Sequence, residues 1–169
     1  MPAVIERPDA AAATEPPETR PLRVLVADDH PLYRQGVARA VARHPELTLV
    51  AEAVDGDDAL ALIQALRPDV AVLDHRMPGL SGTEVCRAIH QDDDPGPTTV
   101  LILSAYEDAD LVWDSVGTGA AGYVGKSASH GQICEAILAV GRGGVAYTER
   151  AAAAVDEGFD RLFGRLGAR

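Results

Sequence analysis

The sequence predicts a doubly wound α/β domain built on a parallel sheet, and three observations support this. Short apolar runs alternate five times with longer amphipathic stretches between residues 22 and 141. The run at residues 70–73 (VAVL) lacks the alternation of a half-exposed strand, as is typical of a strand buried on both faces. Gly, Pro and Asp interrupt the chain between the runs. The alternation favours right-handed crossovers with helices on both faces, and five strands favour the flavodoxin-like order 2-1-3-4-5.

The elements can be assigned in order from these patterns. Each strand is an apolar run, and each helix has apolar residues spaced by three or four, with Pro or Gly near its end. The expected strands are residues 22–27, 47–53, 70–73, 99–103 and 121–124. The expected helices are residues 32–44, 59–66, 83–90, 108–116 and 129–140.

The two ends of the chain differ from this central domain, which we expect to span residues 22–147. Residues 1–21 are rich in Ala, Pro and Glu without periodicity, which predicts a disordered arm. Residues 148–169 are expected to form a C-terminal helix or linker, because apolar residues recur there at helical spacing: Ala152, Val155, Phe159, Leu162 and Leu166. A helix that packs on its own domain, or a linker helix, is favoured over a dimerisation helix because short coiled coils are marginal.

Composition excludes several classes of function. The net charge of −11 argues against direct nucleic-acid binding by this segment. No apolar run is long enough to span a bilayer, and no signal peptide is visible, so we expect a cytoplasmic protein that does not associate with membranes. Cys86 and Cys134 are expected on helices on opposite faces of the sheet, too far apart for a disulfide.

Polar residues stand where four of the predicted strands end. Asp28 and Asp29 follow the first strand, Asp74 the third and Ser104 the fourth, and Lys126 comes just after the fifth. These strands are neighbours in the predicted order, so all five residues should meet at one edge of the sheet. Taken alone, Asp74 is equally well explained as the first residue of a turn.

Three crowded carboxylates repel one another, and a divalent cation removes the conflict. Hard oxygen ligands without His or Cys favour Mg²⁺. His30 and His75 flank the acidic residues but are not expected as metal ligands, because Mg²⁺ sites use oxygen. A carboxylate such as Asp74 can attack a phosphoryl group and form an acyl phosphate. Mg²⁺ and Lys126 would neutralise the developing charge, and the Ser104 hydroxyl would bond a phosphoryl oxygen.

Four segments make the chain resemble a bacterial two-component response-regulator receiver domain, of the group with a LuxR-type helix-turn-helix output. They are VLVADDHPLYRQG, VAVLDHRMPGLSG, LILSAYEDADLV and GAAGYVGKSAS. The resemblance covers residues 22 to about 147, and no helix-turn-helix pattern follows in this sequence.

The resemblance implies that Asp74 accepts a phosphoryl group from a sensor histidine kinase. Asp28 and Asp29 would be the acidic pair that serves Mg²⁺, and the backbone carbonyl of Arg76 would supply a further ligand beside Asp74. The protein would then be a signalling module rather than an enzyme, and would control transcription through an output domain absent from this sequence.

The resemblance also implies a switch. Ser104 would move toward the phosphoryl group, Tyr123 would turn inward, and Lys126 would be the lysine of the phosphorylation site. The face formed by the fourth helix, fifth strand and fifth helix would change, and this face or the C-terminal helix could form a homodimer. Two residues depart from the family pattern: His75 replaces an aliphatic residue, and Gly125 replaces a common leucine.

Two alternatives remain open. A haloacid-dehalogenase-like phosphatase also uses an aspartyl nucleophile, but it needs a second Asp at the position of Arg76 and a cap insertion that this sequence lacks. The other alternative is an interaction module that works without phosphorylation, against which the complete set of pocket residues argues.

Overall fold

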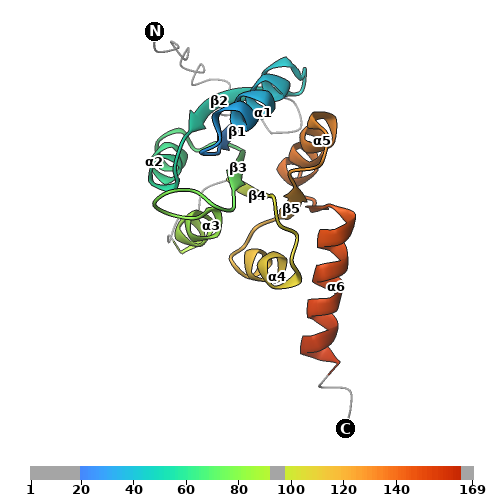
Figure 1. Cartoon of the computed structure of the whole chain (residues 1–169). Coiled ribbons are helices and arrows are strands. Elements are labelled where there is room, and N and C mark those ends of the chain that lie inside the picture. The colour runs from blue at the N-terminus through green and yellow to red at the C-terminus, as the bar shows by residue number, and fades with distance from the viewer. Residues whose placement is uncertain (1–19, 92–97, 165–169) are drawn as a thin grey trace.

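The computed structural model describes residues 20–91 and 98–164, so most of the arm expected over residues 1–21 lies outside the described residues. The chain alternates strands and helices as predicted (Figure 1). The strands are β1 (Leu22–Ala27), β2 (Leu47–Ala53), β3 (Val70–Asp74), β4 (Thr99–Ser104), β5 (Gly122–Gly125) and β6 (Ala146–Tyr147). The helices are α1 (Pro31–Arg43), α2 (Gly56–Leu66), α3 (Gly82–His90), α4 (Ala109–Gly117), α5 (His130–Gly141) and α6 (Glu149–Phe163).

All neighbouring strands pair in parallel, in the order β2-β1-β3-β4-β5-β6. The predicted order of the first five strands is confirmed. The sixth strand was not predicted, because two residues after a glycine-rich turn are too short to show a period. β6 pairs with the outer edge of β5, so it covers one edge of the face on which the switch was expected.

Two hydrophobic cores lie on opposite faces of the sheet. One is formed by side chains from the strands and from α2, α3, α4 and α6, and it includes Cys86. The other is formed with α1 and α5, and it includes Cys134. Both thiols are free and buried. The helices therefore cover both faces, as predicted, and the two cysteines face different cores.

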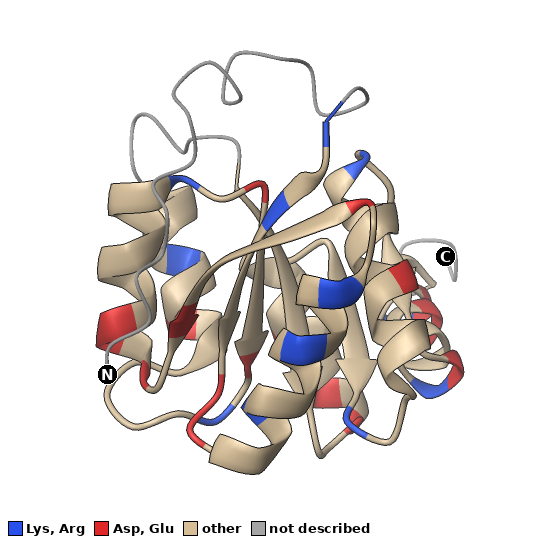
Figure 2. Ribbon diagram, turned by 90° about the horizontal axis from the view of Figure 1, so that it is seen from above, with Lys and Arg blue, Asp and Glu red and all other residues tan. Residues whose placement is uncertain are grey.

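The parallel registers determine which side chains meet at the carboxyl edge of the sheet. Leu73 lies beside Ala27, so Asp74 follows directly next to the end of β1. Asp74 lies beside Leu103, and Ser104 lies beside Gly125. Figure 2 shows acidic segments in red where strands run into loops at this edge.

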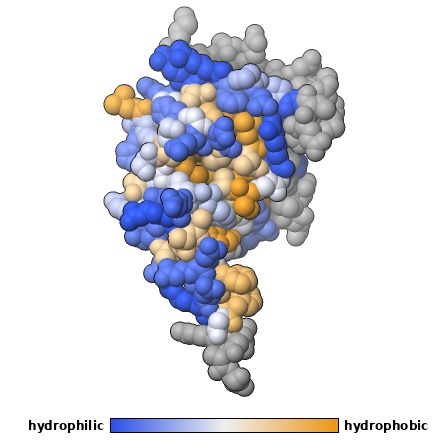
Figure 3. Space-filling model, turned by 90° about the vertical axis from the view of Figure 1, so that its right-hand side faces the viewer, coloured by the Kyte–Doolittle hydropathy of each residue, from blue (hydrophilic) through white to orange (hydrophobic). Residues whose placement is uncertain are grey.

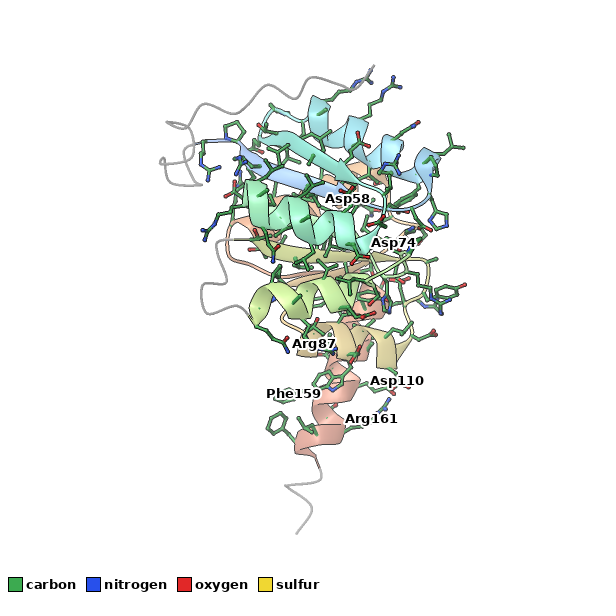
Figure 4. All side chains as sticks on the ribbon, turned by 90° about the vertical axis from the view of Figure 1, so that its left-hand side faces the viewer. Asp58, Asp74, Arg87, Asp110, Phe159 and Arg161 are labelled. Carbon is green, nitrogen blue, oxygen red and sulfur yellow. The ribbon has the colours of Figure 1, made fainter. Side chains whose placement is uncertain are left out.

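The buried stripe of α6 agrees only in part with the one predicted. Val155 of the predicted stripe packs against the core. Ala151 and Ala154 are buried in the core, whereas Phe159 and Leu162 are more than half exposed. The small alanine side chains let α6 and α4 approach closely. Leu166 lies outside the described residues. Figure 4 shows Phe159 projecting away from the domain.

Beyond these alanines, Gly158 lies against the indole ring of Trp113 on α4. Arg161 on α6 and Asp110 on α4 point toward each other, 3.9 Å apart (Figure 4). α6 is thus held along one side of α4, and its far end extends beyond the domain (Figure 1). Across residues 20–91 and 98–164, no helix combines the length and apolar character that crossing a membrane requires.

We predict that Gly158→Ala loosens α6 from α4. A β-carbon at this position would stand 2.4 Å from a carbon of the Trp113 ring, so the ring or the helix must shift. Such overpacking costs about 1–3 kcal/mol of unfolding free energy. Trp113 is the one tryptophan of the sequence, so its fluorescence should shift to the red as the contact opens.

Gly117→Ala is the matched control, since a β-carbon there would meet no described atom within 4 Å. Alanine also has the higher helix propensity, so this variant should be neutral or slightly stabilised, by up to ~1 kcal/mol. Equal stability changes in the two variants would contradict the packing described for α6.

Candidate functional site

The carboxyl ends of β1, β3, β4 and β5 surround one cavity of about 320 Å³. The strand ends bring acidic, basic and hydroxyl side chains to its walls. Its lining consists of Asp29, His30, Asp74, Arg76, Ser104, Ala105, Tyr106 and Lys126. Asp28 is buried behind this lining, where its carboxylate contacts Lys126 Nζ and His30 Nδ1.

Lys126 links the two buried carboxylates of the site. Its Nζ donates a hydrogen bond to Asp28 Oδ2 over 2.8 Å and lies 3.2 Å from Asp74 Oδ2. The backbone N–H of Lys126 donates to the carbonyl of Ser104, which fixes the residue beside the end of β4. The ammonium group also lies 4.5 Å from the centre of the Tyr33 ring, on α1. The lysine is therefore positioned by three separate segments of the chain.

Burial, followed by the negative charge of Asp28, raises the pKa of the Asp74 carboxyl to about 6, and the nearby Lys126 opposes this rise. Asp74 Oδ2 is buried and, apart from its charge contacts with Lys126 Nζ at 3.2 Å and His30 Nδ1 at 3.6 Å, has no partner among the described residues. Asp74 is thus a desolvated carboxylate with an oxygen left for another partner.

The pKa of Asp28 shifts in the opposite direction, although Asp28 is also buried beside Lys126. Burial raises the pKa of Asp28, but the hydrogen bonds from Lys126 and His30 outweigh burial and leave the pKa below its ordinary value. Both the backbone N–H and the ring Nδ1 of His30 lie within hydrogen-bond distance of Asp28 Oδ1, at 2.8 and 2.9 Å. The two neighbouring carboxylates are therefore driven apart in pKa by their different hydrogen bonds.

The donor set fits a divalent cation. Ligand atoms of Asp28, Asp29, His30 and Asp74 lie within 4.8 Å of one another. Asp29 Oδ1 is buried and, like Asp74 Oδ2, accepts no hydrogen bond from the described residues that meets normal geometry. Buried carboxylate oxygens without hydrogen donors are costly unless a cation faces them. The carboxylates supply the oxygen ligands that Mg²⁺ requires.

Ser104 and the loop after β4 form the opposite wall. Ser104 Oγ accepts a hydrogen bond from the Tyr106 backbone N–H, and the hydroxyl of Tyr123 donates to the Tyr106 carbonyl. Tyr123 is completely buried. The ring therefore lies in the expected inward position, where the Tyr106 carbonyl accepts the hydrogen bond of its hydroxyl.

Arg76 lines the cavity beside Asp74. Its backbone N–H is 3.4 Å from Asp74 Oδ1, and its guanidinium lies 4.6 Å from the centre of the Tyr106 ring. The Arg76 side chain and the Tyr106 ring therefore close one side of the entrance. His75 is half-buried, and its Nδ1 is buried without a hydrogen-bond partner among the described residues.

The loop after β4 is also joined to the beginning of α6. The Thr148 hydroxyl donates a hydrogen bond to Glu107 Oε1, and the Thr148 N–H donates to the carbonyl of Tyr123. Glu107 has room because residue 125 is glycine: a β-carbon there would stand 2.6–2.9 Å from the Glu107 carboxyl group. The Gly125 departure thus makes space for a contact between the loop and α6.

Sequence reasoning missed Tyr33 and the pair of Glu107 and Thr148. The Tyr33 hydroxyl is buried without a partner among the described residues, and burial raises its pKa to about 12. In the sequence Tyr33 is one more residue of an amphipathic helix. Glu107 and Thr148 are 41 positions apart, so no local pattern connects them.

Comparison with known proteins agrees with this geometry. Residues 24–138, more than half of the chain, match the family model described as response regulator receiver domain. The chain is 42% identical over 127 residues to the probable transcriptional regulatory protein NarL of Mycobacterium tuberculosis, covering 75% of this chain and 58% of that protein. It is 37% identical over 136 residues to the DNA-binding transcriptional activator DevR/DosR of the same organism, covering 79% and 61%. The chain therefore spans about three fifths of the length of these relatives.

Solved structures lead to the same conclusion. The signal receiver domain of the putative response regulator NarL from Mycobacterium tuberculosis superimposes with a TM-score of 0.70 at 42% identity, covering 73% of this chain and 98% of that one. A two-component response regulator of the LuxR family from Aurantimonas superimposes with a TM-score of 0.75 at 32% identity, covering 84% and 99%. The chain belongs to the response regulator receiver domain family, whose members are signalling modules rather than enzymes.

Proposed function

We propose that this protein acts in the cytoplasm, where Asp74 accepts a phosphoryl group from the phosphohistidine of a sensor histidine kinase. The observation that carries this proposal is the buried Asp74 Oδ2, which lines an open cavity, accepts no hydrogen bond from the described residues and lies 3.2 Å from Lys126 Nζ. This oxygen attacks phosphorus while the bond from phosphorus to the histidine nitrogen breaks, and an acyl phosphate forms on Asp74.

The residues around Asp74 support the transfer. Lys126 and the Ser104 hydroxyl line the same cavity and would contact the oxygens of the transferred group. Asp28, Asp29, Asp74 and the Arg76 carbonyl would hold Mg²⁺, which supplies charge neutralisation for the phosphoryl oxygens. With Lys126, the three carboxylates carry two net negative charges when ionised, which matches a divalent cation.

The two alternatives have less support. A phosphatase of the haloacid-dehalogenase kind needs an acid where this chain has Arg76, and the family to which the chain belongs consists of signalling modules. A module that works without phosphorylation does not need Asp74, Lys126 and Ser104 around one cavity.

The contacts of residues 104–108 suggest how phosphorylation reaches the surface. Ser104 Oγ now accepts the Tyr106 N–H, so a shift of Ser104 toward a phosphoryl oxygen breaks this bond and pulls on the loop. Glu107, in the same loop, holds the hydroxyl of Thr148. Thr148 occupies the N-cap position of α6, yet within the described chain its side chain caps no amide of that helix. Loss of the Glu107 contact would free this hydroxyl and loosen the start of α6.

We place the switched protein contact on α6. β6 covers the outer edge of β5, and α6 packs on α4, so part of the α4–β5–α5 face is already occupied. The exposed apolar side chains of α6 are Phe159, Leu162 and Phe163 (Figure 3). A homodimer would use this surface, and control of transcription would follow through a DNA-binding part like that of the longer relatives.

We predict that Asp74→Asn abolishes labelling by radioactive acetyl phosphate in the presence of Mg²⁺. The amide keeps the shape of the side chain but lacks the nucleophilic oxygen. Asp110→Asn, at a side chain that is 96% exposed on α4, is the control and should label like the unchanged protein. A labelled Asp74→Asn protein would refute the assignment of the acceptor.

We also predict that, with chelator present, Asp74→Asn stabilises the protein at pH 7. Folded Asp74 keeps its proton up to about pH 6, whereas an unfolded aspartate releases it near 3.8. The contribution of Asp74 to the free energy of unfolding is therefore complete below about pH 4 and is lost as the pH rises through 6. Removing this loss should raise the unfolding free energy at pH 7 by an amount on the order of 1–3 kcal/mol.

Urea unfolding at pH 4, 5, 6 and 7 measures this difference. The gain from the substitution should grow across this range and shrink when Mg²⁺ is added, since Mg²⁺ stabilises the ionised carboxylate. A gain that is the same at every pH would show that Asp74 titrates alike in the folded and unfolded states.

Thr148→Val tests the connection to α6. Valine keeps the volume but cannot donate to Glu107, so phosphorylation should no longer be transmitted to α6, while Asp74 still labels with acetyl phosphate. Trp113 packs against α6 and reports on it. Beryllofluoride with Mg²⁺ should change Trp113 emission in the unchanged protein and change it much less in the variant.

Ser127→Ala is the matched control for this experiment. Ser127 lines the same surface hollow as Thr148 and is exposed. Its removal should leave the fluorescence response intact. A full response in Thr148→Val would show that the signal reaches α6 by another route.

A further inference from the structure

β6 ends the sheet on one side, and no other strand of residues 20–91 and 98–164 pairs with its outer edge. On the inner side, the Ala146 N–H donates a hydrogen bond to the Ala121 carbonyl. The Thr148 N–H donates to the Tyr123 carbonyl in the same direction. Backbone groups alternate in direction along a strand, so Tyr147, between these two donors, directs its N–H and C=O away from β5. Such an edge can pair with another extended chain.

A hollow of about 630 Å³ lies beside this edge. One wall is α5, with Gln132, Glu135 and Ala136, and the other is formed by residues 145–150. Figure 3 shows this side of the molecule, on which apolar side chains lie exposed between hydrophilic ones. An extended peptide can add a strand to an exposed sheet edge and place its side chains in pockets beside that edge. The hollow therefore gives β6 the surroundings that strand addition needs.

The hollow carries a net negative charge. Its charged lining residues are Glu107, Glu135, Glu149 and Arg150. Glu107 already accepts the hydrogen bond of the Thr148 hydroxyl. Glu135 and Glu149 are exposed, so their carboxylates can receive basic side chains from a bound partner.

This charge argues against a second copy of the chain as the occupant. Two copies paired edge to edge would bring their glutamates together, and like charges repel. The whole chain, with a net charge of −11, is also acidic. A basic partner has the complementary charge.

An apolar contact is available at the beginning of the edge. Val145, directly before β6, is 67% exposed and lines the hollow. Thr148, directly after β6, keeps an extended backbone with φ −62° and ψ 160°. The edge thus continues beyond the two residues of β6, and Val145 can pack against an apolar side chain of an added strand.

We propose that the groove between β6 and α5 binds an extended basic segment of a partner protein, which pairs with β6 as a further strand. Arg or Lys side chains of this segment contact Glu135 and Glu149, and an apolar side chain contacts Val145. The proposal goes beyond the proposed function, because the groove needs no phosphoryl group on Asp74.

The probe is a fluorescein-labelled hexapeptide of alternating Arg and Val, blocked at both ends, and its anisotropy measures binding to the full chain without acetyl phosphate. The unchanged protein should bind it saturably, and the same peptide with Glu in place of Arg should not bind. Glu135→Gln and Glu149→Gln should each weaken binding about twofold to fivefold, because each removes one exposed ion pair. The double variant should lose about tenfold.

Glu157→Gln is the matched control. Glu157 lies on α6 like Glu149 and is 65% exposed, but it does not line the hollow. This variant should bind the peptide like the unchanged protein.

Strand addition is tested separately with two N-methylated forms of the peptide, one methylated on every Arg and one on every Val. In a strand, the N–H groups of alternate residues point to opposite edges, so only one form loses the donors that face β6. That form should bind about tenfold more weakly or worse, and the other should stay within about threefold. Saturation with the unmethylated peptide should also slow hydrogen exchange of the Tyr147 amide about tenfold or more.

Four results would overturn the proposal: no binding of the Arg–Val peptide, equal affinity of the two methylated forms, unchanged affinity in the double variant, or unchanged exchange of the Tyr147 amide. Sedimentation of the free protein tests the remaining occupant, and self-association through this edge would also overturn the proposal. None of these results affects the labelling of Asp74 by acetyl phosphate, which tests the proposed function.

Discussion

The ammonium group of Lys126, placed between two buried carboxylates, is the interaction on which the site depends. Asp28 and Asp74 come from strands that lie side by side, and both are almost completely buried. Without a cation between them, they would repel each other in a region from which water is largely excluded. Lys126 reaches both, and its own place is fixed by the backbone bond to Ser104 and by the end of β5. The proposed phosphoryl transfer therefore depends on the order of the strands, which brings Asp28, Asp74 and Lys126 together.

One lysine does not neutralise three carboxylates, and the remaining negative charge is shared unequally between Asp28 and Asp74. Asp28 takes the hydrogen bond from Lys126 and two more contacts from His30, so its pKa is lowered. Asp74 has fewer contacts with hydrogen-bond donors, so burial and the negative charge of Asp28 raise its pKa to about 6. The difference leaves Asp74 as the group that a divalent cation or a phosphoryl group can satisfy, and this is why we assign the acceptor role to Asp74 and not to Asp28.

Much of this arrangement could be predicted from the sequence, because strand ends are easy to locate and a parallel sheet gathers them at one edge. Asp28, Asp29, Asp74, Ser104 and Lys126 follow from that rule alone. The buried stripe of α6 could be predicted only in part, because alanine carries almost no hydrophobic signal and the larger Phe159 and Leu162 suggested the wrong face. The contact of Glu107 with Thr148 depends on the space above Gly125, which only the tertiary structure reveals. The orientation of His30 toward the carboxylates was hidden for the same reason.

The central claim is that separate strands form one cation-dependent site for a phosphoryl group on Asp74. A crystal structure of the chain with Mg²⁺ and beryllofluoride tests this most directly. We expect the beryllium bound to an oxygen of Asp74, with fluorine atoms contacting Lys126 and Ser104 and the metal on Asp28, Asp29 and Asp74. Beryllofluoride bound elsewhere, or a metal that leaves Asp28 and Asp29 without contact while Asp74 is occupied, would contradict the account.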